Sequence, residues 1–185
     1  PETRHVPIHP HIAEVLRIQR RLFEAARDVR RHATVPAEAP RRGAVLLSYI
    51  LEPFVHQRVR EWDHHTNSWE SAAMASTFAK LGFDVDVIYY RNRTFIPRKN
   101  YDVFIDSRHN MERLHSRFPN AIKIQHLDTT SMLFHNLGET RRLYELQMRR
   151  GVTLQPRRVE FPNRGLDFAH CGTVIGNAFT ARTWE

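Results

Sequence analysis

The residues of this chain that could do chemistry stand where apolar segments end. Asp106 and Arg108 follow one such segment, His126 and Asp128 follow the next, and Asn177 follows the last. Carboxylate, guanidinium, imidazole and amide groups bind hydroxyls and phosphates, and an imidazole can also relay a proton. If the segments are parallel strands, their carboxyl ends meet at one edge of the sheet, where ligands bind in open α/β folds. The sequence therefore predicts a binding site at that edge.

Each of the first two pairs has a functional and a structural interpretation. His126 can donate to a ligand hydroxyl or relay a proton, with Asp128 fixing the orientation of its ring. In the alternative, Asp128 and Thr129 form a turn by hydrogen-bonding to their own backbone. For Asp106 and Arg108 we favour a local ion pair over a role in binding.

A second candidate region is the long polar loop LEPFVHQRVREWDHHTNSWES, which runs into a predicted helix. Its residue types suit sugar recognition, because polar groups bind hydroxyls and an aromatic face covers the apolar side of a sugar ring. A helix N-terminus here also favours a phosphate or carboxylate. In the alternative, Ser68 caps the helix, Glu70 complements its dipole and Trp69 packs in the core. The candidate residues are His65, Thr66, Asn67, Ser68, Trp69 and Glu70.

Several common catalytic motifs are absent from the sequence. It holds no GxxxxGK, GxGxxG or GxSxG turn, so the usual phosphate loops and nucleophile elbow are excluded. The 12 histidines do not fall into metal-ligand spacings, and we expect no metal. The single cysteine, Cys171, lies in an apolar segment, which predicts a buried and inert thiol.

Strand and helix patterns alternate along the chain from Gly43, and they must position these residues. This alternation predicts an α/β fold with a mostly parallel sheet flanked by helices. The predicted strands are 44–50, 85–90, 102–106, 121–126 and 168–175, and the predicted helices are 68–80, 111–117 and 139–150. Residues 153–165 are predicted to be an irregular connection.

The first 42 residues have a different pattern from the body. Apolar residues recur at helical spacing over 10–31, with arginines on the opposite face, which predicts an extra N-terminal amphipathic helix. The segment ATVPAEAPRRG that follows is rich in alanine and proline and is typical of a linker. We therefore divide the chain into 1–42, helix and linker, and a body at 43–185.

Composition narrows the class of protein. With 185 residues, of which 41% are hydrophobic and 26% charged, the chain can bury the core of one globular domain, and fibrous or wholly disordered classes are excluded. Its formal net charge is +8, but all basic residues except Lys80, Lys99 and Lys123 are arginine, as a GC-rich coding bias also produces. Because the charges are scattered, we expect no nucleic-acid partner.

Taken in order, the stretches NSWESAAMASTFAKLGFDVDVIYY, YDVFIDSR, AIKIQHLDTT and FAHCGTVIGNAFTARTW are similar to the N-terminal half of a glycosyltransferase of the GT-B fold. The resemblance covers about 43–185. The nearest kind is the retaining, nucleotide-sugar-dependent enzymes of family four, of the type found in bacterial polysaccharide synthesis. In that family this half is a Rossmann-like domain that mainly holds the acceptor, while the other half holds the nucleotide-sugar donor.

The resemblance also implies roles for single residues. His126 would face the transferring sugar and polarise its hydroxyls, the stretch from His65 to Glu70 would position the acceptor, and Asn177 would end the last strand of this half. The implied substrates are a nucleotide-sugar donor and a glycan or lipid-linked acceptor, with no other cofactor. The glycine-rich turn that many relatives carry after the first strand is replaced here by LEPFVHQRVREWDHH.

The resemblance further implies that this chain is half of an enzyme. The chain begins at Pro1 without a methionine and ends at Glu185, where the family would enter its donor domain. We therefore expect a hexosyltransferase as the full-length protein, with a donor domain downstream and no turnover from this chain alone. With no signal peptide or apolar span in the sequence, we expect it in the cytoplasm, with association with the inner face of the membrane as an option.

A rival hypothesis is a non-catalytic α/β interaction module. In this interpretation the amphipathic segment 10–31 docks onto a protein partner or an anionic surface. Saccharide binding confined to the loops at the strand ends would favour the transferase over this alternative.

Overall fold

The computed structural model describes residues 31–55 and 66–185. The predicted helix at 10–31, apart from its last residue, lies outside the described residues, as does His65. The strands are β1 (His32–Val35), β2 (Gly43–Tyr49), β3 (Phe83–Tyr89), β4 (Val103–Asp106), β5 (Ile122–Leu127) and β6 (Cys171–Val174). The helices are α2 (Glu52–Val55), α3 (Thr66–Lys80), α4 (Asn110–Leu114), α5 (Met132–Arg150) and α6 (Ala178–Arg182), with 3₁₀ helices η1 (His115–Arg117) and η2 (Arg164–Phe168).

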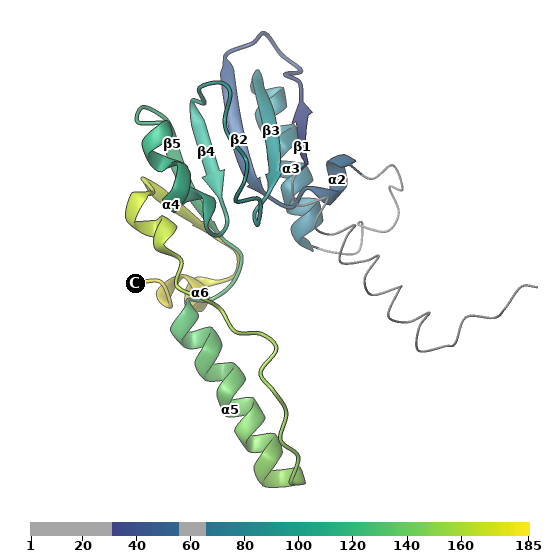
Figure 1. The fold of residues 1–185 in the computed structure, drawn as a ribbon, viewed down its shortest axis with the longest axis vertical. Helices are drawn as coiled ribbons and strands as arrows, with labels where there is room; N and C mark the ends of the chain where they lie inside the picture. Colours follow the sequence, from purple (N-terminus) through teal and green to yellow (C-terminus); the bar gives the residue numbers. More distant parts are fainter. Residues whose placement is uncertain (1–30, 56–65) are drawn as a thin grey trace, which may run out of the picture.

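These strands form one six-stranded sheet, in the order β1-β3-β2-β4-β5-β6 (Figure 1). All neighbouring pairs are parallel except β1 with β3. The α/β class and the mostly parallel, Rossmann-like sheet predicted from the sequence are thus confirmed. Between β2 and β4 the order along the chain reverses, and in such sheets this switch point is where ligands bind.

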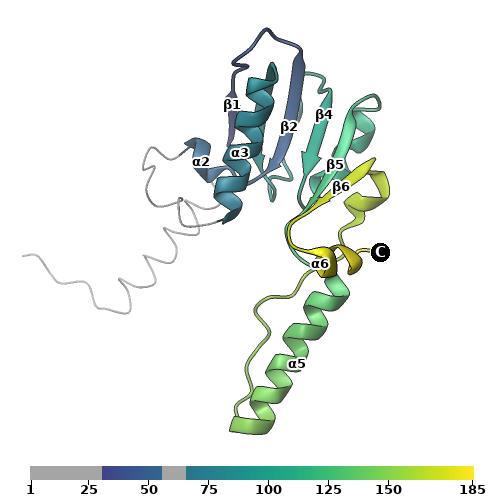
Figure 2. The ribbon, with the colours of Figure 1, turned by 180° about the vertical axis from the view of Figure 1, so that it is seen from behind.

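Alternation along the strands divides the core between the two faces of the sheet. On one face, Val45, Leu47 and Tyr49 of β2 pack with Ala75 of α3, whereas on the other, Leu46 packs toward α4. In Figure 2, α3 lies in front of the sheet, and in Figure 1 it lies behind. Because both faces of the central strands are covered, their sequences are nearly continuous apolar runs.

β1 lies in the segment that was predicted to be a linker. Its residues alternate between exposed and half-buried, and Val35 pairs with Val85 of β3. The Thr34 hydroxyl donates to Asp86 Oδ1 at 2.8 Å, which fixes the strand to the edge of the sheet. The four residues of β1 carry too short an alternation to reveal an edge strand from the sequence.

α5 begins at Met132, seven residues before the predicted start at Glu139. Gly138 stands in its interior, where a side chain would meet no atom within 4 Å, so the helix continues through the glycine. Gly151 ends the helix with φ of 64°, and its amide donates to Gln147 O at 2.8 Å. This is the left-handed C-terminal cap that glycine favours.

The last strand, predicted at 168–175, is shorter in the structure, where β6 spans Cys171–Val174 and Phe168 is the last residue of η2. Asn163 Oδ1 accepts from the Gly165 amide at 3.2 Å and starts this turn. β6 is an edge strand whose residues are all exposed, so Cys171 is exposed and the prediction of a buried thiol is wrong.

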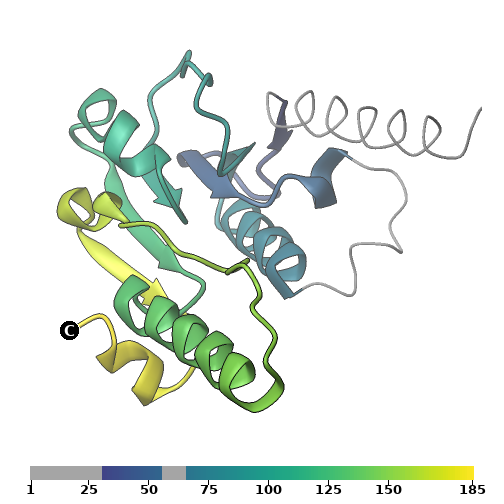
Figure 3. The same ribbon diagram turned by 60° about the horizontal axis from the view of Figure 1, so that its bottom comes forward.

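α5 points away from the sheet, and residues 151–163 run back alongside it toward the body (Figure 1). α6 lies beside the first turns of α5 (Figure 3), where the rings of Phe134 and Phe179 meet edge to face at 5.9 Å. Within the described ranges, no helix combines the length and apolar character needed to cross a membrane.

Candidate functional site

The carboxyl ends of β2, β4 and β5 carry buried polar side chains around the switch point. Tyr49 ends β2, Asp106 ends β4 and His126 is the next-to-last residue of β5. The first turn of α3 lies over the same edge, and its Glu70 side chain reaches the Tyr49 hydroxyl. An open α/β sheet therefore presents its polar residues where ligand binding is expected.

His126 is enclosed on the α3 face of the sheet and is only 4% exposed. Its Nδ1 lies 2.9 Å from Thr173 Oγ1 on the neighbouring strand β6, and its ring meets Tyr49 edge to face at 5.0 Å. Nε2 lies 3.7 Å from Glu70 Oε2, which is too long for a hydrogen bond. Among the described residues, Nε2 has no hydrogen-bond partner. The imidazole is thus oriented from one side and unpaired on the other.

The protonation states of this cluster follow from burial. Burial lowers the pKa of His126 below its ordinary value, although the charges of Glu70 and Asp128 oppose this change. The ring is therefore neutral at pH 7 and has one donor and one acceptor nitrogen. Burial raises the pKa of Tyr49, as does its hydrogen bond to Glu70. Tyr49 accordingly stays protonated and donates to Glu70 Oε2 at 2.9 Å.

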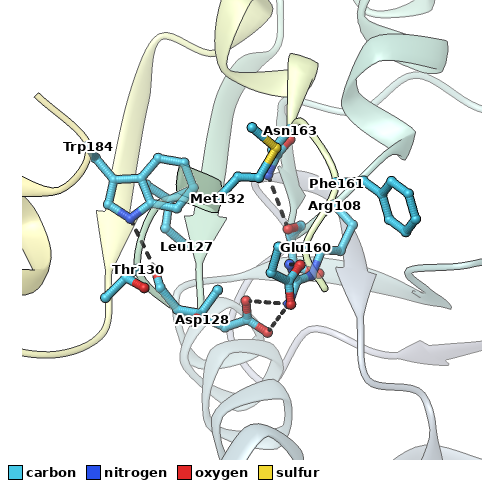
Figure 4. A pocket seen from close by; sticks show the side chains of 11 residues that line it. Arg108, Leu127, Asp128, Thr130, Met132, Glu160, Phe161, Asn163 and Trp184 are labelled. Atoms are coloured by element: carbon cyan, nitrogen blue, oxygen red, sulfur yellow. Dashed lines mark hydrogen bonds and ion pairs between the residues drawn. The ribbon is translucent and has the colours of Figure 1, made fainter. Parts of the chain in front are cut away.

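A charged group lies beside this cluster, in the pocket shown in Figure 4. Arg108 extends between Asp128 and Glu160, with Nη2 2.9 Å from Asp128 Oδ1 and Nη1 bonded to Glu160. Asn67 Nδ2, from the first turn of α3, lies 3.5 Å from Asp128 Oδ2. Residues from α3, the loops after β4 and β5 and the segment after α5 therefore meet at one point.

The same pocket is closed by the end of the described chain. Trp184 Nε1 donates to Thr129 O at 3.0 Å, and the Ser131 amide donates to Thr183 Oγ1 at 3.0 Å (Figure 4 shows the first of these). The loop between β5 and α5 is thereby held against the segment that follows α6. The pocket lining is Ser107, Arg108, Leu127, Asp128, Thr129, Thr130, Met132, Glu160, Phe161, Asn163 and Trp184.

On the opposite face of the sheet, three buried polar residues form one row. Ser48, Asp106 and Gln125 are register partners on β2, β4 and β5. Asp106 Oδ2 accepts from the Met111 amide at 2.8 Å, and Asn110 Nδ2 donates to Ser48 Oγ at 2.9 Å. Both side-chain polar atoms of Gln125 lack a hydrogen-bond partner among the described residues.

Two predicted pairings at the strand ends are wrong. Arg108 does not pair with Asp106, because the Asp106 side chain points under α4 and accepts from its backbone, whereas Arg108 turns toward Asp128. Asp128 does not orient the His126 ring either, since it bonds to Arg108 while Thr173 holds Nδ1. Arg108 and Asp128 both lie beyond the ends of their strands, so strand geometry does not set where their side chains point, and contacts with other segments decide their partners.

The predicted loop residues fall into two groups. Asn67 and Glu70 are three positions apart on α3 and both face the site. Thr66 and Trp69 are exposed, so the alternative in which Trp69 packs in the core is wrong. α3 starts two residues before Ser68, which lies buried inside the first turn, so Ser68 does not cap the helix as the alternative predicted.

Asn177 follows the last strand as predicted, but its side chain has a structural task. Its Oδ1 accepts from the amides of Phe179 and Thr180 and caps α6, and the residue is exposed. It belongs to the start of α6, and among the described residues its side chain forms no hydrogen bond with the His126 cluster or the Arg108 group.

The structure adds three residues to this edge that the sequence does not single out, Tyr49, Thr173 and Glu160. Tyr49 and Thr173 lie inside apolar strands, so only the predicted strand order could have placed them beside His126. Glu160 lies in an irregular segment with no periodic signal, 52 positions from Arg108 in the sequence.

The chemistry available at this edge is hydrogen bonding and proton exchange. A neutral imidazole, carboxylates and a guanidinium suit ligands that carry several hydroxyls, or a hydroxyl beside an anionic group. In the parts of the chain that the structure describes, no three histidine, cysteine or acidic residues are placed to hold a metal ion.

We compared the chain with protein-family models, with curated proteins and with solved structures, and nothing matched in any of the three.

Proposed function

We propose that this chain is the acceptor-side domain of a nucleotide-sugar-dependent glycosyltransferase, which transfers a hexosyl group to a glycan or lipid-linked acceptor. The observation that carries the proposal is the oriented, neutral His126 with its unpaired Nε2 at the switch-point edge of the sheet. A neutral imidazole can accept from or donate to a sugar hydroxyl without the cost of burying a charge. The sequence resemblance supplies the reaction class, and the site supplies groups that suit it.

In this proposal the two groups of the site have different tasks. Asp128, Thr129 and Thr130 line the pocket and would bind acceptor hydroxyls, while His126 contacts the transferring sugar. Because Nε2 is enclosed, sugar binding requires the first turn of α3, with Asn67 and Glu70, to shift away from it. The donor would be held by a second unit, in the same polypeptide or in a partner.

The first test titrates the chain with methyl hexosides and with a nucleotide-hexose while backbone NMR signals are followed. We expect weak binding, on the order of millimolar, because half of the site gives few contacts. The shifted signals should include those of Asn67, Glu70 and Asp128. Shifts confined to another part of the sheet would remove this edge as the sugar site.

The second test uses the full-length enzyme and its turnover. His126→Ala should lower turnover at least about tenfold while circular dichroism stays unchanged, since the group that contacts the sugar is lost. His32→Ala, on the far edge of the sheet, is the matched control and should leave turnover unchanged. Wild-type turnover in His126→Ala would remove His126 from the mechanism.

The intact mass of the natural gene product decides where the donor-binding unit lies. A mass of about twice 21.9 kDa or more would place it in the same polypeptide. A mass of 21.9 kDa would require a partner subunit for turnover.

The interaction-module alternative is favoured by a different observation, the exposed apolar side chains of α5. A contact between two copies of the chain could also cover those side chains, and such a contact is compatible with either function.

A further inference from the structure

α5 has two faces with different surroundings. Its inner face contacts the segment that runs back to the body: His135 Nε2 lies 3.0 Å from Arg158 O, and Asn136 Nδ2 donates to Glu160 O at 2.9 Å. Glu139 on the same face is buried and accepts from the Arg157 amide. The inner face is therefore satisfied within the chain.

The outer face carries large apolar side chains that the described residues leave uncovered. Leu133, Leu137, Tyr144 and Met148 are between 62% and 73% exposed. At 3.6 residues per turn their positions fall on one stripe along the helix. Since α5 projects from the body (Figure 1), no helix or strand within 31–55 or 66–185 covers this stripe. Contiguous apolar patches of this kind mark interaction sites.

The spacing of the four residues in this stripe is symmetric about the middle of the helix. Four positions separate Leu133 from Leu137, seven separate Leu137 from Tyr144, and four separate Tyr144 from Met148. The midpoint falls between Thr140 and Arg141. A two-fold axis through this midpoint would bring Leu133 against Met148 and Leu137 against Tyr144 of a second, antiparallel helix. A closed two-fold interface requires this kind of self-complementary surface.

Charge distinguishes the antiparallel from the parallel arrangement. The last turn of α5 carries Arg149 and Arg150, and its first turn carries no acidic residue and no arginine or lysine. Parallel helices would bring four arginines together at one end. Antiparallel helices separate them and also oppose the two helix dipoles favourably. They further bring the Met148 end of one helix to the exposed Phe134 and Phe179 at the base of the other.

We propose that two copies of this chain associate through the outer faces of α5, antiparallel about a two-fold axis near Thr140 and Arg141. The arrangement places the two sheets at opposite ends of the helix pair, because α5 leaves each body at its N-terminal end (Figure 1). The interface is independent of the proposed transferase reaction.

Site-specific cross-linking tests the arrangement directly. All variants carry Cys171→Ser, which removes the exposed native thiol. Thr140→Cys, at the midpoint, should give a cross-linked dimer with a short bismaleimide. Leu133→Cys alone should not cross-link, but a mixture of Leu133→Cys with Met148→Cys should. Efficient cross-linking of Leu133→Cys to itself would overturn the antiparallel arrangement in favour of a parallel one.

The second test measures mass in solution by light scattering. The wild-type chain should show twice 21.9 kDa at micromolar concentration. Leu137→Glu with Tyr144→Glu should weaken association at least about a hundredfold, because two charges would enter the middle of an apolar interface. Ile96→Glu, an equally exposed isoleucine in the loop after β3, is the matched control and should stay dimeric.

A wild-type chain that stays monomeric at high micromolar concentration would overturn the proposal. The stripe would then be a contact surface for a different protein. If the double glutamate variant fails to fold, the cross-linking result at Thr140 still decides, since that threonine is exposed and lies outside the apolar stripe.

Discussion

At the scale of single residues, Asp106 is the most deeply buried acidic residue in the described part of the chain. It is fully buried, and burial raises its pKa to about 6, although hydrogen bonds from Ser48 and from the backbone of Met111, Arg108 and Asn110 lower it. Burying a charge in a protein interior costs more than these hydrogen bonds return. The carboxyl group therefore holds its proton over part of the pH range in which an unfolded chain would lose it.

This raised pKa predicts a pH dependence of stability. The ordinary value is 3.8, so between about pH 4 and 6 the folded state binds more protons than the unfolded state. The stability contributed by protonated Asp106 is fully present below pH 4 and is lost as pH rises through 6, by about 3 kcal/mol at 1.36 kcal/mol per pKa unit. Asparagine cannot ionise, so the free energy of unfolding of Asp106→Asn, measured by urea denaturation, should rise relative to that of the wild type as pH increases over this window.

The difference between variant and wild type isolates Asp106, because His126 acts in the opposite direction. Its lowered pKa makes the folded state lose stability as pH falls through 6.5, in both proteins alike. If the difference between Asp106→Asn and wild type were the same at pH 4 and pH 8, the raised pKa would be refuted.

A second residue-scale prediction concerns the coupling between Glu70 and His126. The Glu70 charge raises the pKa of His126 against the effect of burial. Glu70→Gln should therefore lower that pKa further, as measured from the imidazole signals in an NMR titration. Glu112→Gln, an exposed glutamate on α4, is the control and should leave it unchanged. An unchanged His126 pKa in Glu70→Gln would show that the charge of Glu70 does not act on the imidazole.

The sequence was enough to place polar residues at the strand ends, because apolar runs and their termini are local signals. It was not enough to choose their partners. Arg108 has Asp106 two positions away but pairs with Asp128, 20 positions away, since strand alternation sends Asp106 to the opposite face. Thr173 was not predicted because its contact with His126 spans 47 positions in the sequence.

At the scale of elements, two glycines of α5 should respond to the same substitution with opposite signs. Gly138→Ala should stabilise the protein by about 0.5–1 kcal/mol, because its φ is ordinary, the new methyl group meets open space and alanine favours the helix. Gly151→Ala should destabilise it by about 1 kcal/mol, because φ of 64° is strained for alanine. Thermal unfolding of both variants measures the contrast.

The pair contains its own control, since the chemical change is identical and neither methyl group meets another atom within 4 Å. A shift of the same sign in both variants would mean that backbone conformation does not decide the effect.

Long elements were predicted better than short ones for a physical reason. α3 and the central strands carry strong apolar patterns, and their bounds differ from the prediction by about two residues. β1 has four residues and lies at an edge, so too few side chains repeat to give a pattern. The start of α5 was placed too late because its N-terminal half is held by contacts with residues 158–160, which local propensity does not contain.

At the scale of the whole molecule, the sheet and the projecting α5 unit are joined mainly at its base. Glu160 bonds to Arg108 there, and Asn136 exchanges hydrogen bonds with Glu160. Replacing 140–156 by a three-residue glycine-serine linker should leave the thermal midpoint of the sheet within a few degrees, because the removed residues add no core to the body. The ends to be joined are close, since Glu139 accepts from the Arg157 amide.

The shortened protein should also be monomeric, because the exposed stripe loses Tyr144 and Met148. A large loss of thermal stability in the shortened monomer would show that α5 supports the sheet. The full chain carrying Leu137→Glu and Tyr144→Glu separates this effect from loss of the dimer.

The segment between α5 and η2 has a consequence for how the protein can be cut and rebuilt. Residues 151–159 are all exposed and form no helix or strand, which is where proteases nick a folded chain first. A cut there divides the polypeptide but leaves β6 paired with β5 and Thr173 bonded to His126. We therefore expect the two pieces to associate as complementing fragments. The first piece holds His126 but lacks Thr173, so recovery of the native His126 signal on mixing the two pieces would report their reassembly.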